Sequence, residues 1–240
     1  MKHKTCTINH SIDNTAVTRP PSIETANLRD FAAEVLGLLN QTSNCSDLIK
    51  NILFLIKVVT GLEAAGLRLR EGDDFPYYET LGFSKEFVEA ERSLCSHDQT
   101  GAYTRDSQGN IYLECMCGNV ICGRTDSSLP FFTEGGSFWT NSTTALLAST
   151  TSEDRQGRTR NRCNSEGYES VALIPLRYNK NNIGLLQLND SRKNMFTSQL
   201  ISFFEGVGPS IAHAINHRQR EDTQSQGNNK PVKTGQGRGS

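Results

Sequence analysis

The stretch YESVALIPLRYNKNNIGLLQLN, residues 168–189, decides how this 240-residue chain folds. Two apolar runs, residues 168–177 and 182–189, are separated by the polar residues Tyr-Asn-Lys-Asn. Short apolar runs of this kind are typical of buried strands, so the stretch predicts an antiparallel hairpin. Pro175 has no backbone N–H to donate, and it predicts an edge or a bulge at that point of the first strand.

Working outward from the hairpin, periodicity predicts the other elements. A helix over residues 196–216 is indicated by apolar residues at helical spacing, which are Leu200, Phe203, Phe204, Val207, Ile211 and Ile215. Upstream, the pattern predicts helices over 23–39, 46–60 and 84–92, and strands over 64–70, 75–81, 111–117 and 138–142. Residues 143–149 and 152–160 are predicted to form helical turns.

This order of elements, with the Ile183-Gly184 step and the Phe196-Thr197 helix start, resembles a GAF domain, the small-molecule sensory module of signalling proteins. Residues 118–124 resemble its short pocket helix. The signatures LECMCG, GRTDSSLPFFTEGGSFWTNSTT and RTRNRCN are similar to a cysteine-bearing GAF subgroup in sensor histidine kinases of methanogenic archaea and anaerobic bacteria. The resemblance covers residues 43–217.

The resemblance implies an α/β (α+β) fold. We expect a central antiparallel sheet of about six strands, with the N- and C-terminal helices on one face and a ligand pocket on the other. The expected organisation is a flexible arm (1–22), a leading helix (23–42), a GAF sensory domain (43–219) and a disordered tail (220–240) that is rich in Gly, Gln, Asn and Lys. Because GAF domains often dimerise through flanking helices, the resemblance implies a homodimer; core packing is the other interpretation of the apolar stripe in the leading helix.

Net charge and hydropathy limit the classes of binding partner that the sequence favours. Lys and Arg total 25 and Asp and Glu total 26, so the net charge of −1 favours neither nucleic acid nor a membrane surface. No apolar run approaches the ~20 residues that a membrane helix needs. We therefore expect a cytoplasmic protein in a reducing environment, with no nucleic-acid or membrane partner.

The seven cysteines are too few for a disulfide scaffold and odd in number. Cys115 and Cys117, two apart on the predicted strand 111–117, would share one face, for which we favour the pocket side. Loops over the pocket would bring Cys95 and Cys163 near them. Four thiolates suit a soft metal or an iron–sulfur cluster, although their spacing matches no standard zinc or ferredoxin pattern. Ordinary buried thiols and redox-active cysteines remain the other interpretations.

Two further chemistries follow from the resemblance. Some GAF domains of the similar kinases carry haem, at times attached through a cysteine, and here His97 is the histidine nearest a pocket loop; His213 is expected to be a plain helix-face side chain. Another GAF relative reduces free methionine sulfoxide with paired cysteines, and Cys122 with Cys115 or Cys117 would supply such a pair.

Two loops complete the candidate pocket. Phe138, Trp139 and Asn141 are the expected pocket contacts, because aromatic walls with a few polar groups suit a planar ligand; a core plug is the alternative. Four arginines, Arg155, Arg158, Arg160 and Arg162, are predicted either to hold an anionic group or to form a solvated face paired with Glu153, Asp154 and Glu166.

These observations favour a sensory module of signal transduction, of the kind found in two-component systems. It would bind a small molecule or redox cofactor and bias its flanking helices, with a histidine kinase or response regulator as partner. No phospho-accepting histidine box followed by an ATP-binding domain is seen, so we expect a stand-alone sensor or an excised module, and we assign no catalytic residue. A reductase of free methionine sulfoxide and a purely structural or dimerisation role are the alternatives.

Overall fold

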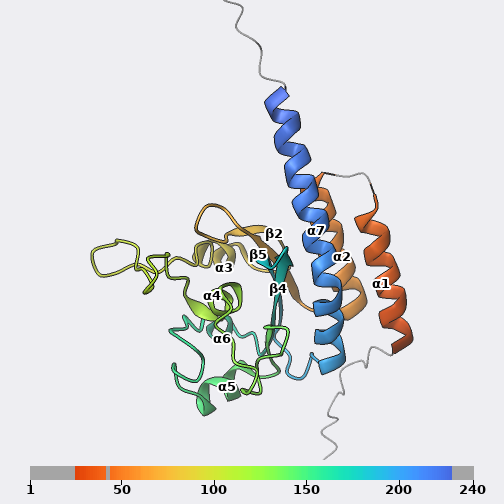
Figure 1. The fold of residues 1–240 in the computed structure, drawn as a ribbon. Helices are drawn as coiled ribbons and strands as arrows, with labels where there is room; N and C mark the ends of the chain where they lie inside the picture. The colour runs from red at the N-terminus through yellow and green to blue at the C-terminus, as the bar shows by residue number, and fades with distance from the viewer. Residues whose placement is uncertain (1–24, 42–43, 229–240) are drawn as a thin grey trace, which may run out of the picture.

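A five-stranded antiparallel sheet forms the centre of the molecule, in a computed structural model that describes residues 25–41 and 44–228 (Figure 1). The strand order is β2-β1-β5-β4-β3. The strands are β1 (Ala64–Leu69), β2 (Tyr77–Leu81), β3 (Phe138–Thr140), β4 (Ser170–Tyr178) and β5 (Asn181–Asp190). The mixed α+β class and the antiparallel sheet predicted from the sequence are confirmed, with five strands in place of about six.

Helices cover both faces of this sheet, in two layers of different character (Figure 1). One face carries three longer helices, α1 (Thr25–Leu39), α2 (Cys45–Thr60) and α7 (Ser198–Asn228). The other face carries the short helices α3 (Lys85–Ala90), α4 (Cys115–Cys122), α5 (Thr143–Ser149) and α6 (Arg162–Ser165), with the loops between them. The N- and C-terminal helices therefore share one face, as the sequence predicts.

The β4–β5 hairpin is formed as predicted. The two strands pair from Ser170 opposite Asp190 to Tyr178 opposite Asn181. The turn residues Asn179 and Lys180 both have positive φ, +48° and +67°, which is the geometry of a tight two-residue hairpin turn.

Proline in β4 is tolerated because its outer neighbour is short. Strand β3 pairs only with Val171, Ala172 and Leu173, so Pro175 lies beyond its end, where the sheet has an edge. The register of the hairpin shifts between Leu176 and Arg177, next to this edge. Both features that Pro175 predicted are present, the edge at the proline and the irregularity just after it.

Two apolar clusters lie on opposite faces of the sheet. Leu186 and Leu188 of β5 belong to the cluster beneath α1, α2 and α7, while Leu185 belongs to the cluster beneath α4. Since successive strand side chains point to opposite faces, Gln187 and Asn189 share the side of Leu185. The face beneath α4 therefore contains polar groups in its floor.

The apolar stripe of α1 packs into the core. Phe31 and Val35 are buried, and the Phe31 ring stacks on that of Phe203 in α7 with centroids 4.7 Å apart. This contact supports core packing of the stripe, one of its two interpretations. Arg218 of α7 also donates to the backbone oxygens of Leu39 and Gln41, at 3.0 and 2.6 Å, and ties the end of α1 to α7.

Three predicted boundaries differ from the structure. The predicted strand 111–117 is not formed: Ile111 and Leu113 make only isolated bridges, and Cys115 begins α4. Residues 152–160 form turns without a helix. Helix α7 continues to Asn228, beyond the predicted end at 216 and into the predicted tail. The predicted arm (1–22) and the last residues of the tail (229–240) lie outside the described residues.

None of the helices in the described ranges combines the length and the apolar character required to cross a membrane.

Candidate functional site: a cavity lined by three thiols

A small cavity lies between the sheet and the short helices of the α4 side. Its volume is about 50 Å³, and a single water needs roughly 10–15 Å³, so it can hold a compact group of a few heavy atoms. Phe138, Val171 and Leu173 form the sheet side of the wall. The remaining wall comes from the start of α4 and from the covering segment, residues 143–164, which contains α5, the turns after it and the start of α6.

Three of the predicted cysteines line this cavity, Cys115, Cys117 and Cys163. Cys115 and Cys117 do so from the first turn of α4 rather than from a strand. Cys115 has φ +66°, an uncommon value for a residue other than glycine, and it turns the chain sharply into the helix.

Gly118 holds α4 against the preceding segment. A Cβ at this position would lie 2.4 Å from the backbone oxygen of Leu113, a distance that no side chain could occupy. Glycine is therefore required for the close approach that places the first turn of α4 over the sheet.

A glutamine side chain connects two of the cavity thiols. Gln187 Oε1 lies 3.7 Å from Cys117 Sγ, and Gln187 Nε2 lies 3.7 Å from Cys163 Sγ. The same amide accepts a hydrogen bond from Tyr77 Oη at 2.7 Å and donates one to Asn189 Oδ1 at 3.2 Å. This polar network lies beneath the cavity, within an otherwise apolar sheet face.

The three thiols differ in acidity. A side-chain hydrogen bond from Cys117 lowers the pKa of Cys115 from the ordinary 9.0 to about 7, against the opposing effect of burial. The same hydrogen bond, followed by burial, raises the pKa of Cys117 well above its usual range. Burial is the largest cause that raises the pKa of Cys163 to about 12. At neutral pH the reactive thiolate is therefore Cys115, and the other two residues are protonated thiols.

A buried cation lies near the polar network. Arg68 is fully buried (0% exposed), with its guanidinium 3.6 Å above the ring of Tyr77. Its terminal nitrogens donate to the backbone oxygens of Phe75 at 3.0 Å and Glu91 at 2.7 Å. A positive charge in this place favours the ionised form of neighbouring thiols.

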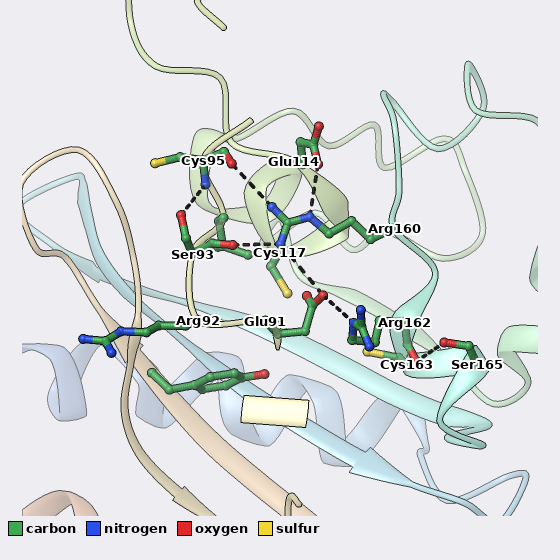
Figure 2. Close-up of polar contacts among 12 residues, drawn as sticks. Glu91, Arg92, Ser93, Cys95, Glu114, Cys117, Arg160, Arg162, Cys163 and Ser165 are labelled. Carbon is green, nitrogen blue, oxygen red and sulfur yellow. Dashed lines mark hydrogen bonds and ion pairs between the residues drawn. The ribbon is translucent and has the colours of Figure 1, made fainter. Parts of the chain in front are cut away.

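Ion pairs hold the covering segment in place (Figure 2). Arg160 Nε lies 3.0 Å from Glu114 Oε2, and Arg160 Nη1 donates to the backbone oxygen of Ser93 at 2.7 Å. Arg162 Nε lies 3.3 Å from Oε1 of Glu91, a buried carboxylate. Burial is the largest cause of the raised pKa of Glu91.

The four arginines, Arg155, Arg158, Arg160 and Arg162, thus do not form the solvated face that is one interpretation of the sequence. Of the acidic partners expected for a solvated face, Glu166 pairs with Arg162 at 3.5 Å, but the closest ion pairs of the loop are with Glu91 and Glu114. Two of the arginines, Arg160 and Arg162, therefore anchor the covering segment, whereas Arg155 lines the cavity.

Cys95 does not reach the cavity. It lies in an isolated bridge with Leu113, and Figure 2 shows its sulfur directed away from that of Cys117. Burial, followed by the charge of Asp74, raises its pKa to about 11. Across residues 25–41 and 44–228, no group of three or more His, Cys, Asp or Glu side chains is placed to hold a metal ion. The four-cysteine metal site remains a prediction without support from this geometry, and an iron–sulfur cluster would lack its fourth thiolate.

Haem does not fit the residues present. His97 is exposed and packs on the ring of Tyr103, with centroids 4.7 Å apart, on a loop that does not line the cavity. The cavity is also smaller than a haem ring. His213 lies on α7 beside Tyr178, as expected for a helix-face side chain.

The three predicted pocket contacts are separated by the sheet edge. Phe138 lines the cavity, whereas Trp139 and Asn141 line a different, more open surface groove. Asn141 also accepts from the backbone nitrogen of Phe196 at 2.9 Å and donates to its oxygen at 2.8 Å, which fixes the start of α7. Cys122 is exposed and lies in another surface groove, outside the cavity.

The polar floor of the site is absent from the sequence predictions. Gln187 and Asn189 occupy alternate positions in the buried part of β5, and Arg68 interrupts the buried strand β1. A polar residue at a position that the strand period assigns to the interior is a signal, and it could have marked this floor in advance.

Comparison with known proteins agrees with this architecture. No family model matches the chain, and neither does any curated protein. Among solved structures, the GAF domain of a phosphoenolpyruvate-protein phosphotransferase (ptsP) from Coxiella burnetii is similar, with 14% identity and a TM-score of 0.58 over 82% of this chain and 98% of that one.

Two solved reductases are also similar. One is the free methionine-R-sulfoxide reductase from Neisseria meningitidis in complex with its substrate, with 12% identity and a TM-score of 0.55 over 81% of this chain and 91% of that one. The other is fRMsr of Staphylococcus aureus in complex with substrate, with 11% identity and a TM-score of 0.53 over 79% and 95%.

Together these likenesses show that the chain has a GAF fold. At such identities they carry the fold alone, so the resemblance to the cysteine-bearing kinase subgroup stays a prediction.

Proposed function

We propose that this protein is a sensory GAF module that responds to small molecules and oxidants through the thiols of its cavity. The observation that carries the proposal is the placement of Cys115, Cys117 and Cys163 around one cavity, with a buried amide between two of them. Three thiols in a core of ordinary packing would not need a polar network beneath them.

The acidity of Cys115 supports redox chemistry with a peroxide as oxidant. The Cys115 thiolate attacks one peroxide oxygen, the O–O bond breaks, and the leaving alkoxide or hydroxide takes up a proton. The product is a sulfenic acid on Cys115. The Cys117 sulfur then attacks the Cys115 sulfur while its proton passes to the sulfenic hydroxyl, so that the S–O bond breaks, a disulfide forms and water leaves. Cys117 is the suitable second thiol because it lies two residues from Cys115 in the first turn of α4 and lines the same cavity.

A change at this pair has a route to the other face of the sheet. Cys117 contacts Gln187 on β5, and α7 packs against β4 and β5 from the opposite side. Movement of the first turn of α4 would therefore alter the support of α7, the helix that projects from the domain (Figure 1). A histidine kinase or response regulator in contact with α7 is the partner that this route would serve.

The test is thiol oxidation on protein purified without oxygen. Limiting hydrogen peroxide should form a Cys115–Cys117 disulfide, detected by mass spectrometry of peptides. Cys115→Ser should abolish the reaction at the cavity, whereas Cys122→Ser, which alters an exposed thiol outside it, should leave it unchanged. Oxidation that proceeds equally in Cys115→Ser and wild type would overturn the proposal.

A second candidate, the reduction of free methionine sulfoxide, is favoured by one observation. The fold is similar to two solved reductases in complex with substrate, and this chain also has several thiols at one cavity. A cavity thiolate would attack the sulfoxide sulfur, the oxygen would pass to the cysteine as sulfenic acid with uptake of a proton, and methionine would leave. A second thiol would then form a disulfide and release water, and an external dithiol would reduce it.

Turnover separates the two candidates. Free methionine sulfoxide and dithiothreitol should be consumed together by a reductase, at a rate that Cys115→Ser, Cys117→Ser or Cys163→Ser lowers. A sensor should form its disulfide with peroxide and show no turnover of the sulfoxide.

A further inference from the structure

Arg155 is a buried cation with an unused hydrogen-bond donor at the cavity. Its side chain is 7% exposed and lines the cavity from the covering segment. Nη1 donates to the backbone oxygen and the hydroxyl of Thr150, at 2.7 and 2.8 Å. Nε is buried and has no hydrogen-bond partner. A buried donor without a partner is uncommon and indicates a group that belongs there.

Arg155 also takes part in no close ion pair with a described residue. Among the described residues, no acidic oxygen lies within 4.0 Å of a side-chain nitrogen of Arg155. Its sequence neighbour Asp154 is exposed and instead accepts hydrogen bonds from Thr151. A buried guanidinium without a counter-ion is costly, and an anion that enters beside it removes that cost.

The cavity wall has no carboxylate to serve instead. Among the described residues that line the cavity there is no Asp or Glu. The other lining arginine, Arg162, already pairs with Glu91 and Glu166. The excess of positive charge is therefore at Arg155, opposite an apolar wall that includes Phe138, Leu146 and Leu173.

We propose that the cavity binds a compact monovalent oxyanion, such as a short-chain carboxylate, with its charged oxygens on Arg155 and its apolar end against Phe138 and Leu173. The inference rests on the proposed ligand-binding role of the cavity and names the chemical class of the ligand. The volume of about 50 Å³ limits the ligand to a few heavy atoms. Nε of Arg155 has almost no accessible surface in this conformation, and once the side chain turns toward the cavity it would form a charge-assisted hydrogen bond with a carboxylate oxygen.

Binding has a consequence for the thiols that share the cavity. A bound anion disfavours a second negative charge nearby, so it reduces the thiolate fraction of Cys115. By linkage, ionisation of Cys115 weakens anion binding to the same extent. The ligand would thus control the reactivity of the thiol.

The experiment compares acetate with acetamide, which has nearly the same shape and no charge. Calorimetric titration of the full chain should detect binding of acetate, with at least tenfold weaker binding of acetamide. Arg155→Met should weaken acetate binding at least tenfold, and Arg155→Lys, which keeps the charge, should recover part of it. Arg158→Met is the matched control, because Arg158 belongs to the same segment and its side chain is 80% exposed.

The outcomes separate this inference from the proposed function. Acetate should also slow the peroxide oxidation of Cys115 in wild type and not in Arg155→Met. Equal binding of acetate and acetamide, no binding of either, or undiminished acetate binding by a folded Arg155→Met protein would overturn the anion site. Peroxide oxidation that persists under any of these results would leave the thiol sensor intact.

Discussion

The two faces of one strand, β5, carry opposite chemistry. Leu186 and Leu188 point into the cluster beneath α1, α2 and α7, whereas Gln187 and Asn189 point to the thiol cavity. The face beneath α1, α2 and α7 is packed with apolar side chains, whereas the cavity face contains buried amides, thiols and guanidinium groups. Stability and chemistry are therefore divided between the two sides of the sheet, and substitutions on each side should have separable effects.

The largest expected effect is on the helix face. Leu186→Ala leaves a cavity in a fully packed cluster, and large-to-small changes of this kind cost about 2–5 kcal/mol of unfolding free energy. Urea denaturation measures this loss. Under conditions in which the variant is folded, the reactivity of Cys115 should equal that of wild type; a large change in reactivity would show that the two faces are not separable.

The next largest effect is the pH dependence of the cavity thiol. With a pKa of about 7, the thiolate fraction of Cys115, and with it the rate of alkylation, should rise about tenfold between pH 6 and pH 8. The rate of iodoacetamide labelling at Cys115, followed by mass spectrometry, checks this.

The same pKa has a consequence for stability. Because folding lowers the pKa of Cys115 from 9.0, ionisation of this thiol adds to the free energy of unfolding. This stabilisation is fully present above pH 9 and is lost as the pH falls through 7. A labelling midpoint at pH 9 would contradict the hydrogen bond from Cys117.

A smaller effect is expected for the hydroxyl of Tyr77. Tyr77→Phe removes the 2.7 Å hydrogen bond to Gln187. It should lower the free energy of unfolding by about 1–3 kcal/mol, because the buried amide oxygen loses a donor. The change should also alter the labelling rates of Cys117 and Cys163, which the amide connects. A change in stability with unaltered thiol reactivity would mean that the network is only structural.

The smallest effect is expected at an exposed position within the covering segment. Arg158→Met should change the unfolding free energy by no more than about 0.5 kcal/mol, as is usual for exposed positions, because its pair with Glu114 is long, at 3.9 Å, and solvated. Thermal unfolding measures this. A clear loss of stability would assign Arg158 an anchoring role like that of Arg160.

The parts of the fold that the sequence predicted are those set by local pattern. The hairpin follows from two apolar runs and a polar turn, and α5 forms at residues 143–149, where helical turns are predicted. Helix α7 extends further than its apolar residues, because the polar residues after Asn216 include good helix formers such as Arg, Gln and Glu.

The site was predicted less completely because its geometry depends on contacts distant in sequence. The left-handed backbone of Cys115 and the contact of Gly118 with Leu113 turn an expected strand into a helix start. The separation of Cys95 from the other thiols depends on bridges that fold residues 95–113 on themselves. No periodicity in the sequence encodes these contacts.

The orientation of the Gln187 amide has one further consequence. The phenol of Tyr77 donates to the amide oxygen, which fixes the oxygen on one side and the NH₂ group on the other. Cys117 therefore faces the amide oxygen, an acceptor, and Cys163 faces the amide nitrogen, a donor, although both cysteines line the same cavity. A reagent that enters the cavity therefore meets two sulfurs in different hydrogen-bonding states. The Cys117 thiol donates a hydrogen bond to the amide oxygen, whereas the Cys163 sulfur accepts one from the amide NH₂ group.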